Sequence, residues 1–236
     1  GQGGRGVYYE HGAVAAAARC ATLIDAHRLP PNRYPLVQEF VRASGWGVSC
    51  LYWNGEKLAS FTHRRLREKA PSGGTSTLRV SAHAQILEDA ADTLLRSLRW
   101  HGLAMVEFKY DDATDEYWIL EINPRVWGSI ALPVHCGVDF PFWLYLCAVD
   151  RVDEARVLAA AAANNPIDRI SRWLLGDTVQ FLRAVAHGDL AQAWNVCFGV
   201  TADFWDDLAW DDPAAFLGEC SNYLVQLGKI VFTPRA

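Results

Sequence analysis

The stretch that decides the fold is VEFKYDDATDEYWILEINPR, residues 106–125. Two β-prone runs flank a polar stretch around Thr114, which predicts an antiparallel hairpin. Alternate residues of a strand share a face, so a hairpin that closes symmetrically about Thr114 places Glu107 directly opposite Glu121. Cβ atoms of such a pair lie about 5 Å apart. The sequence therefore predicts two neighbouring carboxylates.

The same alternation assigns the other residues of the hairpin to two faces. The polar face is expected to carry Met105, Glu107 and Lys109 from the first strand with Tyr117, Ile119, Glu121 and Asn123 from the second. The opposite face is expected to be apolar and to cover a core, with Ala104, Val106, Phe108, Trp118, Leu120 and Ile122.

Two carboxylates at that distance repel by roughly 3 kcal/mol at an effective dielectric constant near 20, so something must compensate their charge. A hard divalent cation such as Mg²⁺ does so, because it binds carboxylate and amide oxygens and leaves positions for substrate phosphates. Asn123 supplies a third oxygen, and Arg125 supplies a positive fork for a phosphate or carboxylate. A plainer arrangement also fits: Lys109 pairs with one carboxylate and water solvates the other.

Composition describes an ordinary globular chain of 236 residues, with 51% hydrophobic and 21% charged residues. The net charge of −5 argues against nucleic acid or an anionic membrane as a partner, and no apolar run is long enough to span a bilayer. Six cysteines lie far apart without a CxxC pair, which favours reduced thiols and a cytoplasmic location. The chain begins in a glycine cluster without Met, so we expect it to start partway through a longer protein.

Other elements follow from local signals. Asn54-Gly55 between apolar runs predicts a second hairpin, and helical spacing of Leu87, Ala91, Leu94 and Leu98 predicts a helix from Ser81 to about Trp100. Residues 36–41 read as a strand and residues 64–80 as an exposed loop. A short helix is expected from Ser129 to Gly137, and further helices near 169–186 and 214–228. The acidic aromatic run FWDDLAWDD, residues 204–212, is expected to be a solvated helix edge rather than a metal site.

VEF, a short hairpin and then EINPR together resemble the metal and phosphate motif of the ATP-grasp superfamily, which includes biotin carboxylase, D-alanine:D-alanine ligase and carbamoyl phosphate synthetase. Four further stretches occur in the order that this fold requires. GQGGRGVYY resembles its glycine-rich phosphate loop, VQEFV its hinge strand, HRRLREKAPSGG a basic segment of the biotin-carboxylase branch, and WGSIALPVHCGVDFP a branch labelled carboxylate-amine ligase.

The resemblance implies an α+β ATP-grasp fold, with two subdomains of antiparallel sheets flanked by helices. It covers residues 1–150, with a hinge near 38–41 and an incomplete N-terminus, and leaves residues 151–236 as a mainly helical C-terminal extension.

It also implies roles for individual residues. Glu107, Glu121 and Asn123 are expected to bind Mg²⁺, with Mn²⁺ as the alternative ion, and Arg125 and Arg64 are expected to act in catalysis. The residues expected to bind ATP are Gly3, Gly4, Gly6, Gln38, Glu39 and Val41.

The sequence also departs from the superfamily. The lysine before the glycine loop and the usual N-terminal domain are not in this chain, and GWGVSC, residues 45–50, lacks the ribose-binding Glu that many members carry after the hinge. Val126, Trp127, Gly128 and Ser129 stand where biotin carboxylase has Gln-Val-Glu around bicarbonate, which argues against carboxylation.

The implied activity is that of an ATP-grasp carboxylate-amine or carboxylate-thiol ligase of the EC 6.3 type. ATP would phosphorylate a small carboxylate, and an amine or another nucleophile would displace phosphate from the acyl phosphate. A homodimer is one assembly that fits. Two alternatives stay open for this chain: a truncated nucleotide-binding module without turnover, and a protein-interaction domain.

Overall fold

The structure is a computed structural model that describes residues 7–68, 75–209 and 212–232. It divides into two compact units, residues 1–42 and residues 43–236, which we describe separately.

The first unit contains helix α1 (Ala13–His27), a short 3₁₀ helix (Pro31–Arg33) and an extended segment. Helix α1 ends at Arg28, whose φ of 49° forms a left-handed cap, and none of its residues is buried. Tyr9 and Phe40 contact edge to face with ring centroids 5.4 Å apart. The expected strand at residues 36–41 is not formed, because no described residue of this unit offers the neighbouring strand that a β ladder requires.

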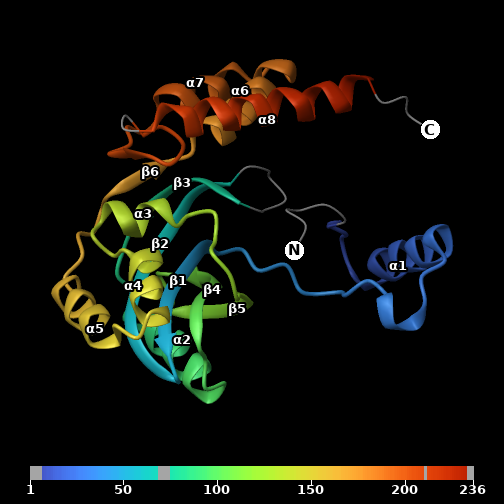
Figure 1. Cartoon of the computed structure of the whole chain (residues 1–236). Coiled ribbons are helices and arrows are strands. Elements are labelled where there is room, and N and C mark those ends of the chain that lie inside the picture. Colours follow the sequence, from blue (N-terminus) through green and yellow to red (C-terminus); the bar gives the residue numbers. More distant parts are fainter. Residues whose placement is uncertain (1–6, 69–74, 210–211, 233–236) are drawn as a thin grey trace. The chain divides into compact units, whose positions relative to one another are not determined.

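The second unit is built on a seven-stranded sheet in the order β5-β4-β1-β2-β3-β6-β7 (Figure 1). Its strands are β1 (Ser44–Trp53), β2 (Glu56–Glu68), β3 (Ser76–Ser81), β4 (Gly102–Asp111), β5 (Glu116–Asn123), β6 (Ile170–Arg172) and β7 (Phe204–Trp205). Every neighbouring pair is antiparallel except β6 and β7. All described strands belong to this one sheet.

The second predicted hairpin is confirmed. Asn54 and Gly55 have φ values of 52° and 84°, the left-handed pair of a tight turn between β1 and β2. The expected loop at 64–80 is wrong over most of its length, because β2 continues to Glu68 and β3 begins at Ser76. Residues 69–74 lie outside the described residues. Strand β3 is buried along nearly all of its sequence, STLRVS. Its small and polar residues are not typical of a central strand, so the sequence did not predict it.

The opening hairpin forms β4 and β5, and Glu107 is paired with Glu121 as predicted. Between this pair and the turn, Leu120 is an extra residue, so Phe108 pairs with Ile119 instead of Leu120. The bulge reverses the expected faces of the turn-proximal half of β5. Tyr117, expected beside Glu121, contacts Phe108 on the other face, with ring centroids 5.9 Å apart.

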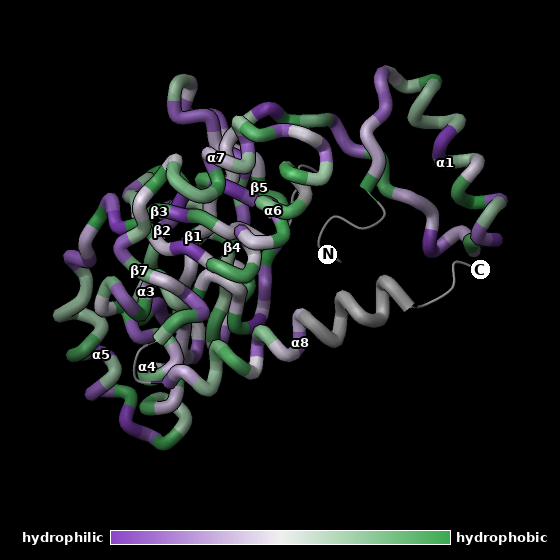
Figure 2. The backbone as a smooth tube through the Cα atoms, turned by 90° about the horizontal axis from the view of Figure 1, so that it is seen from above, coloured by the Kyte–Doolittle hydropathy of each residue, from purple (hydrophilic) through white to green (hydrophobic). Residues whose placement is uncertain are grey.

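Helices cover the two faces of the sheet differently. Helix α2 (Gln85–Ser97) packs on one face through Leu87, Ala91 and Leu95 against Val48, Val106 and Phe108. On the other face, α3 (Ala131–His135), α4 (Phe140–Ala148) and α5 (Val152–Ala161) cover one half with Trp127, Leu132 and Phe140. In Figure 2, α5 alternates hydrophilic and hydrophobic residues, as expected for a helix with one buried side. The remaining half of this face carries polar side chains.

The segment after residue 168 adds two strands to the sheet. Strand β6 pairs with β3, and β7 pairs with β6, so the sheet continues past the boundary expected at residue 150. Helices α6 (Leu174–Ala186), α7 (Leu190–Phe198) and α8 (Pro213–Phe232) lie beyond β3 and β6 (Figure 1).

The described residues of the acidic aromatic run do not form the expected helix edge, and Trp210 and Asp211 lie outside the described residues. Phe204 and Trp205 form β7, and the carboxylate of Asp207 accepts bonds from the backbone N–H groups of Leu174 and Leu175 at 3.1 and 2.8 Å. Asp207 therefore caps the start of α6 from a distant part of the chain.

Candidate functional site

The site is centred on the facing carboxylates of Glu107 and Glu121. The amide nitrogen of Asn123 lies between them, 2.9 Å from Oε1 of Glu107 and 3.3 Å from Oε1 of Glu121. Asn123 is buried, and its amide oxygen accepts a bond from Arg125 at 3.3 Å. One amide thus joins both carboxylates and the guanidinium that follows them.

Lys109 does not form the ion pair with Glu107 or Glu121 that would be the plainer way to balance their charge. Its ammonium donates to the backbone carbonyl of Ala43 at 3.1 Å. The positive charge that pairs with Glu107 belongs instead to Arg65 on β2, whose guanidinium lies 2.6 Å from Oε2 of Glu107. Arg65 also lies 3.7 Å from Glu68.

Two glycines of β1 let side chains of β2 lie across that strand. A Cβ on Gly45 would lie 3.1 Å from Cδ of Arg65, and one on Gly47 would lie 2.5 Å from Cε1 of His63. Gly47 pairs with Glu107 on one side and with His63 on the other, so the missing side chain opens the space between them. Gly45 and Gly47 of the run GWGVSC therefore leave room on the sheet for the side chains of Arg65 and His63.

His63 is buried beside this space. Its Nε2 lies 3.4 Å from the hydroxyl of Ser129, which is itself buried in the loop after Arg125. Burial lowers the pKa of His63 well below its ordinary value, and the charges of Arg65 and Arg79 lower it further. The imidazole is therefore neutral at pH 7.

The structure places the expected catalytic residues differently. Arg125 joins the site through Asn123. Arg64 does not: its guanidinium lies 5.9 Å from the ring of Trp46, which packs in the α2 core, and 3.6 Å from Asp112. Adjacent strand residues point to opposite faces, so Arg65 rather than Arg64 reaches the carboxylates. Sequence reasoning missed Arg65, although its parity with the glycines of β1 could have revealed it.

The residues expected to bind ATP are not part of the second unit. Gln38, Glu39 and Val41 belong to the first unit, where Gln38 and Glu39 are exposed and Val41 is half-buried. Gly3, Gly4 and Gly6 lie outside the described residues.

The donor set fits Mg²⁺ by its chemistry. No group of three His, Cys, Asp or Glu residues suited to a metal occurs among the described residues, so this site depends on two carboxylates and one amide. The Asn123 amide already lies within bonding distance of both carboxylates, and a half-turn of its plane would present the oxygen there instead of the nitrogen. Oxygen donors of this kind suit a hard cation that keeps further positions for water and phosphate.

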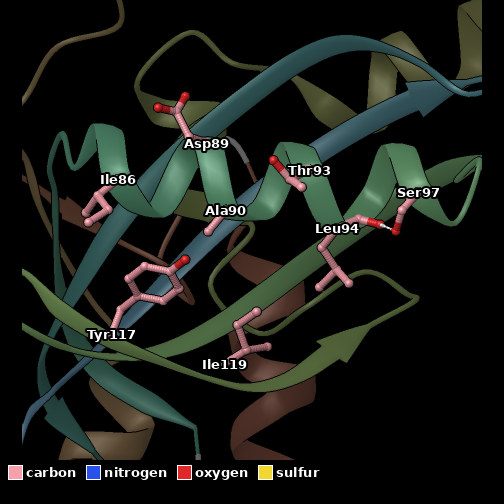
Figure 3. Close-up of a pocket in the computed structure, with 8 residues that line it drawn as sticks. All are labelled: Ile86, Asp89, Ala90, Thr93, Leu94, Ser97, Tyr117 and Ile119. Atoms are coloured by element: carbon pink, nitrogen blue, oxygen red, sulfur yellow. Dashed lines mark hydrogen bonds between the residues drawn. The ribbon is translucent and has the colours of Figure 1, made fainter.

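A groove of about 510 Å³ lies elsewhere, between α2 and β5 on the opposite face of the sheet. Figure 3 shows Tyr117 and Ile119 pointing from β5 toward Ala90 and Leu94 of α2. The bulge at Leu120 places Tyr117 and Ile119 on the face that lines this groove, and the carboxylates of Glu107 and Glu121 are not among its lining residues.

A family profile described as "ATP-grasp in the biosynthetic pathway with Ter operon" matches residues 33–168, which include both carboxylates, Asn123 and Arg65. The chain belongs to this ATP-grasp family. The resemblance inferred from EINPR is therefore confirmed, and so is the ATP-grasp fold class. No helix among the described residues of this ATP-grasp chain combines the length and the hydrophobicity needed to cross a bilayer.

Relatives of this ATP-grasp chain are similar over short stretches. D-alanine--D-alanine ligase from Acidiphilium cryptum (strain JF-5) is 40% identical over 74 residues, which are 29% of this chain and 23% of that protein. Acetyl-CoA carboxylase 1 from Arabidopsis thaliana is 34% identical over 92 residues, which are 34% of this chain and 4% of that protein. The chain thus spans less than a quarter of either relative.

A solved structure shows the same fold. It is the biotin carboxylase domain dimer of Hydrogenobacter thermophilus 2-oxoglutarate carboxylase, in complex with MgADP, ADP and bicarbonate. The TM-score is 0.50 at 14% sequence identity, over 63% of this chain and 34% of that chain.

Proposed function

We propose that this chain is the metal- and phosphate-binding part of an ATP-dependent ligase that joins a small carboxylate to an amine or another nucleophile. The observation that carries the proposal is the amide of Asn123 held between the facing carboxylates of Glu107 and Glu121, with Arg65 and Arg125 beside them. Family membership supports the ligase class, and the MgADP bound by the biotin carboxylase relative supports the nucleotide and the metal.

In this proposal Glu107, Glu121 and Asn123 hold Mg²⁺ or Mn²⁺. The ion would neutralise charge on the phosphates of ATP. The γ-phosphoryl group moves to a carboxylate oxygen of the substrate, which yields ADP and an acyl phosphate. The nucleophile then bonds to the acyl carbon as inorganic phosphate leaves.

The protein side chains position these groups rather than react with them. Arg125, which donates to the backbone carbonyl of Val126, and Arg65, which pairs with Glu107, offer positive charge to the transferred phosphoryl group. We transfer to Arg65 the role expected for Arg64, because Arg65 is on the carboxylate face. Carboxylation is not the reaction that we propose, because Ser129 stands where biotin carboxylase is expected to have a bicarbonate-binding Glu.

We also propose a cellular location, an assembly and further nucleotide contacts for this chain. All six cysteines are free, which supports a cytoplasmic setting. The homodimer stays a prediction, and so does nucleotide binding by Gln38, Glu39, Val41 and the glycines before them.

The test is ADP release by the full chain with Mg²⁺, ATP and pools of small carboxylates and amines. We compare the native protein with Glu121→Ala and with a matched control, Glu116→Ala, an exposed residue on the same strand. Release that is lost only in Glu121→Ala supports the ligase. Mg²⁺-dependent nucleotide binding without release contradicts turnover by this chain and favours the binding module. Absence of both nucleotide binding and ADP release at every Mg²⁺ concentration contradicts both and leaves the interaction domain.

A further inference from the structure

Arg79 of β3 is a buried charge on the carboxylate face of the sheet. It is paired with Arg65 across β2 and β3, so the two side chains share a face. Arg79 has 0% of its surface exposed, and it therefore cannot contact a ligand itself. Arg79 can therefore influence a bound ligand only through the residues that it contacts.

The counter-charge of Arg79 comes from the segment after the family match. Its guanidinium forms an ion pair with Asp206, which follows β7, and donates to the carbonyl oxygen of Ser76 at 2.8 Å. The other oxygen of Asp206 accepts a bond from the hydroxyl of Ser171 on β6. Strands β6 and β7 thus bring one carboxylate to the one arginine that β3 buries on this face.

These contacts make a row of charges across the sheet. Asp206 holds Arg79, Arg79 lies beside Arg65, and Arg65 holds Glu107. The two middle charges repel, and each forms an ion pair with a carboxylate at its own end of the row. Burial lowers the pKa of Arg79 to about 10, and the charge of Arg65 contributes to that lowering.

We propose that Asp206 is a positioning residue for the carboxylate site and acts on Glu107 through Arg79 and Arg65. This inference rests on the proposed function. It assigns a role to the segment of residues 169–209, which completes the charge balance of a site whose ligands all lie earlier in the chain.

The effect on a cation has a definite sign. Without the charge of Asp206, Arg79 loses the carboxylate of its ion pair, although the charges of Asp177 and Asp207, which raise its pKa, remain. The positive charge beside Arg65 is then less fully balanced, and Glu107 is the next carboxylate in the row. Arg65 and Arg79 then both attract the carboxylate of Glu107, and this attraction competes with a cation for the oxygens of Glu107. The excess positive charge of the two arginines also repels the cation directly. Cation binding at Glu107 and Glu121 must weaken.

The first experiment measures binding of Mn²⁺ alone by calorimetry and electron paramagnetic resonance, on the full chain. We expect Asp206→Asn, which keeps the shape of the side chain, to weaken Mn²⁺ binding about tenfold. The matched control is Asp203→Asn, which removes the same charge from the same segment but pairs with Arg169 at 3.1 Å. The control is expected to stay within twofold of the native protein.

A rescue variant separates positioning from mere structure. Arg79→Met combined with Asp206→Leu removes both charges and keeps apolar volume, so it should restore Mn²⁺ binding to within about threefold. Binding that is as weak in the folded double variant as in Asp206→Asn would overturn the inference. So would Asp206→Asn indistinguishable from Asp203→Asn.

A second measurement does not depend on any ligand. Urea denaturation measures how much Asp206→Asn increases the unfolding constant. We compare that increase in the native background with the increase in a Glu107→Gln background. Residues of one network couple, so we expect the two increases to differ at least fivefold, about 1 kcal/mol. Equal increases would overturn the inference. Absence of Mn²⁺ binding in the native protein would instead contradict the proposed function, while this coupling would still decide the role of Asp206.

Discussion

At the scale of single residues, the site depends as much on absent side chains as on present ones. Gly47 lies between Glu107 and His63, and a Cβ there would lie 2.5 Å from Cε1 of the imidazole. Because His63 is buried, its ring cannot move into solvent.

We therefore expect Gly47→Ala to lower the free energy of unfolding by about 1–3 kcal/mol, measured by urea denaturation. Gly218→Ala on α8 is the control, because nothing lies within 4 Å of its added Cβ. Alanine stabilises a helix more than glycine does, so this variant should raise the free energy of unfolding by about 0.5–1 kcal/mol. A loss in the control equal to that in Gly47→Ala would refute the steric explanation.

His63 gives the protein a pH dependence of stability. Its pKa is lowered in the folded state, so below about pH 6.5 the unfolded chain binds a proton that the folded chain does not. Stability is fully present above that pH and falls as the pH falls through it.

We expect His63→Gln to remove about 1.4 kcal/mol of the difference in unfolding free energy between pH 7.5 and pH 5.5. Denaturation curves of the native protein and the variant at both pH values provide the measurement. An unchanged difference in the variant would show that His63 is not the group responsible.

Arg65 and Arg64 test the parity of β2. Hydrogen bonds from a charged donor are worth about 1.5–3 kcal/mol, so Arg65→Met should weaken metal-free ATP binding by about tenfold or more. Arg64→Met, on the opposite face, should leave the dissociation constant within twofold. Calorimetry with ATP and a chelator measures both, and the reverse ranking would contradict our choice of Arg65.

At the scale of elements, the sequence was informative where a local signal was strong. Periodicity predicted the β4–β5 hairpin with the Glu107–Glu121 pair and helix α2, and Asn54-Gly55 predicted the first hairpin. The bulge at Leu120 could not be predicted, because an extra residue in a strand leaves no mark on a short apolar run. It reversed the faces of Tyr117 and Ile119, which now line the groove beside α2.

Elements held by distant partners were also missed. Strand β3 is central only because β6 pairs with its far edge, and the predicted strand at 36–41 has no partner among the described residues. Asp206 and Asp207 act on residues far away in the chain, which local patterns do not reveal. Tertiary contacts decided each of these elements.

The long-range cap on α6 is testable by itself. Asp207 accepts two backbone bonds at the start of the helix, so Asp207→Ala should cost about 1 kcal/mol of unfolding free energy. Asp207→Asn keeps an acceptor oxygen and should cost clearly less. Equal losses in the two variants, measured by thermal denaturation, would show that charge rather than capping matters.

At the scale of the whole molecule, the family match ends at residue 168, but the sheet does not. The segment of residues 169–209 supplies β6, β7 and the counter-charge of a buried arginine. A chain that ends at Asp168 leaves Arg79 without Asp206.

We expect that truncation to lower the free energy of unfolding by about 3–5 kcal/mol, the usual cost of breaking a buried ion pair. Residues 43–236, a compact unit by themselves, should keep the melting temperature of the full chain. Circular dichroism melting of both truncated chains checks this. A chain ending at Asp168 with native stability would contradict the role given to the segment.

The central claim is that Glu107, Glu121 and Asn123 form one divalent cation site, and Mn²⁺ binding tests it most directly. Electron paramagnetic resonance should count one tight site in the native protein, lost in Glu107→Gln and in Glu121→Gln and kept in the control Glu116→Gln, which lies on the same strand. Equal Mn²⁺ affinity in all four proteins would contradict the claim.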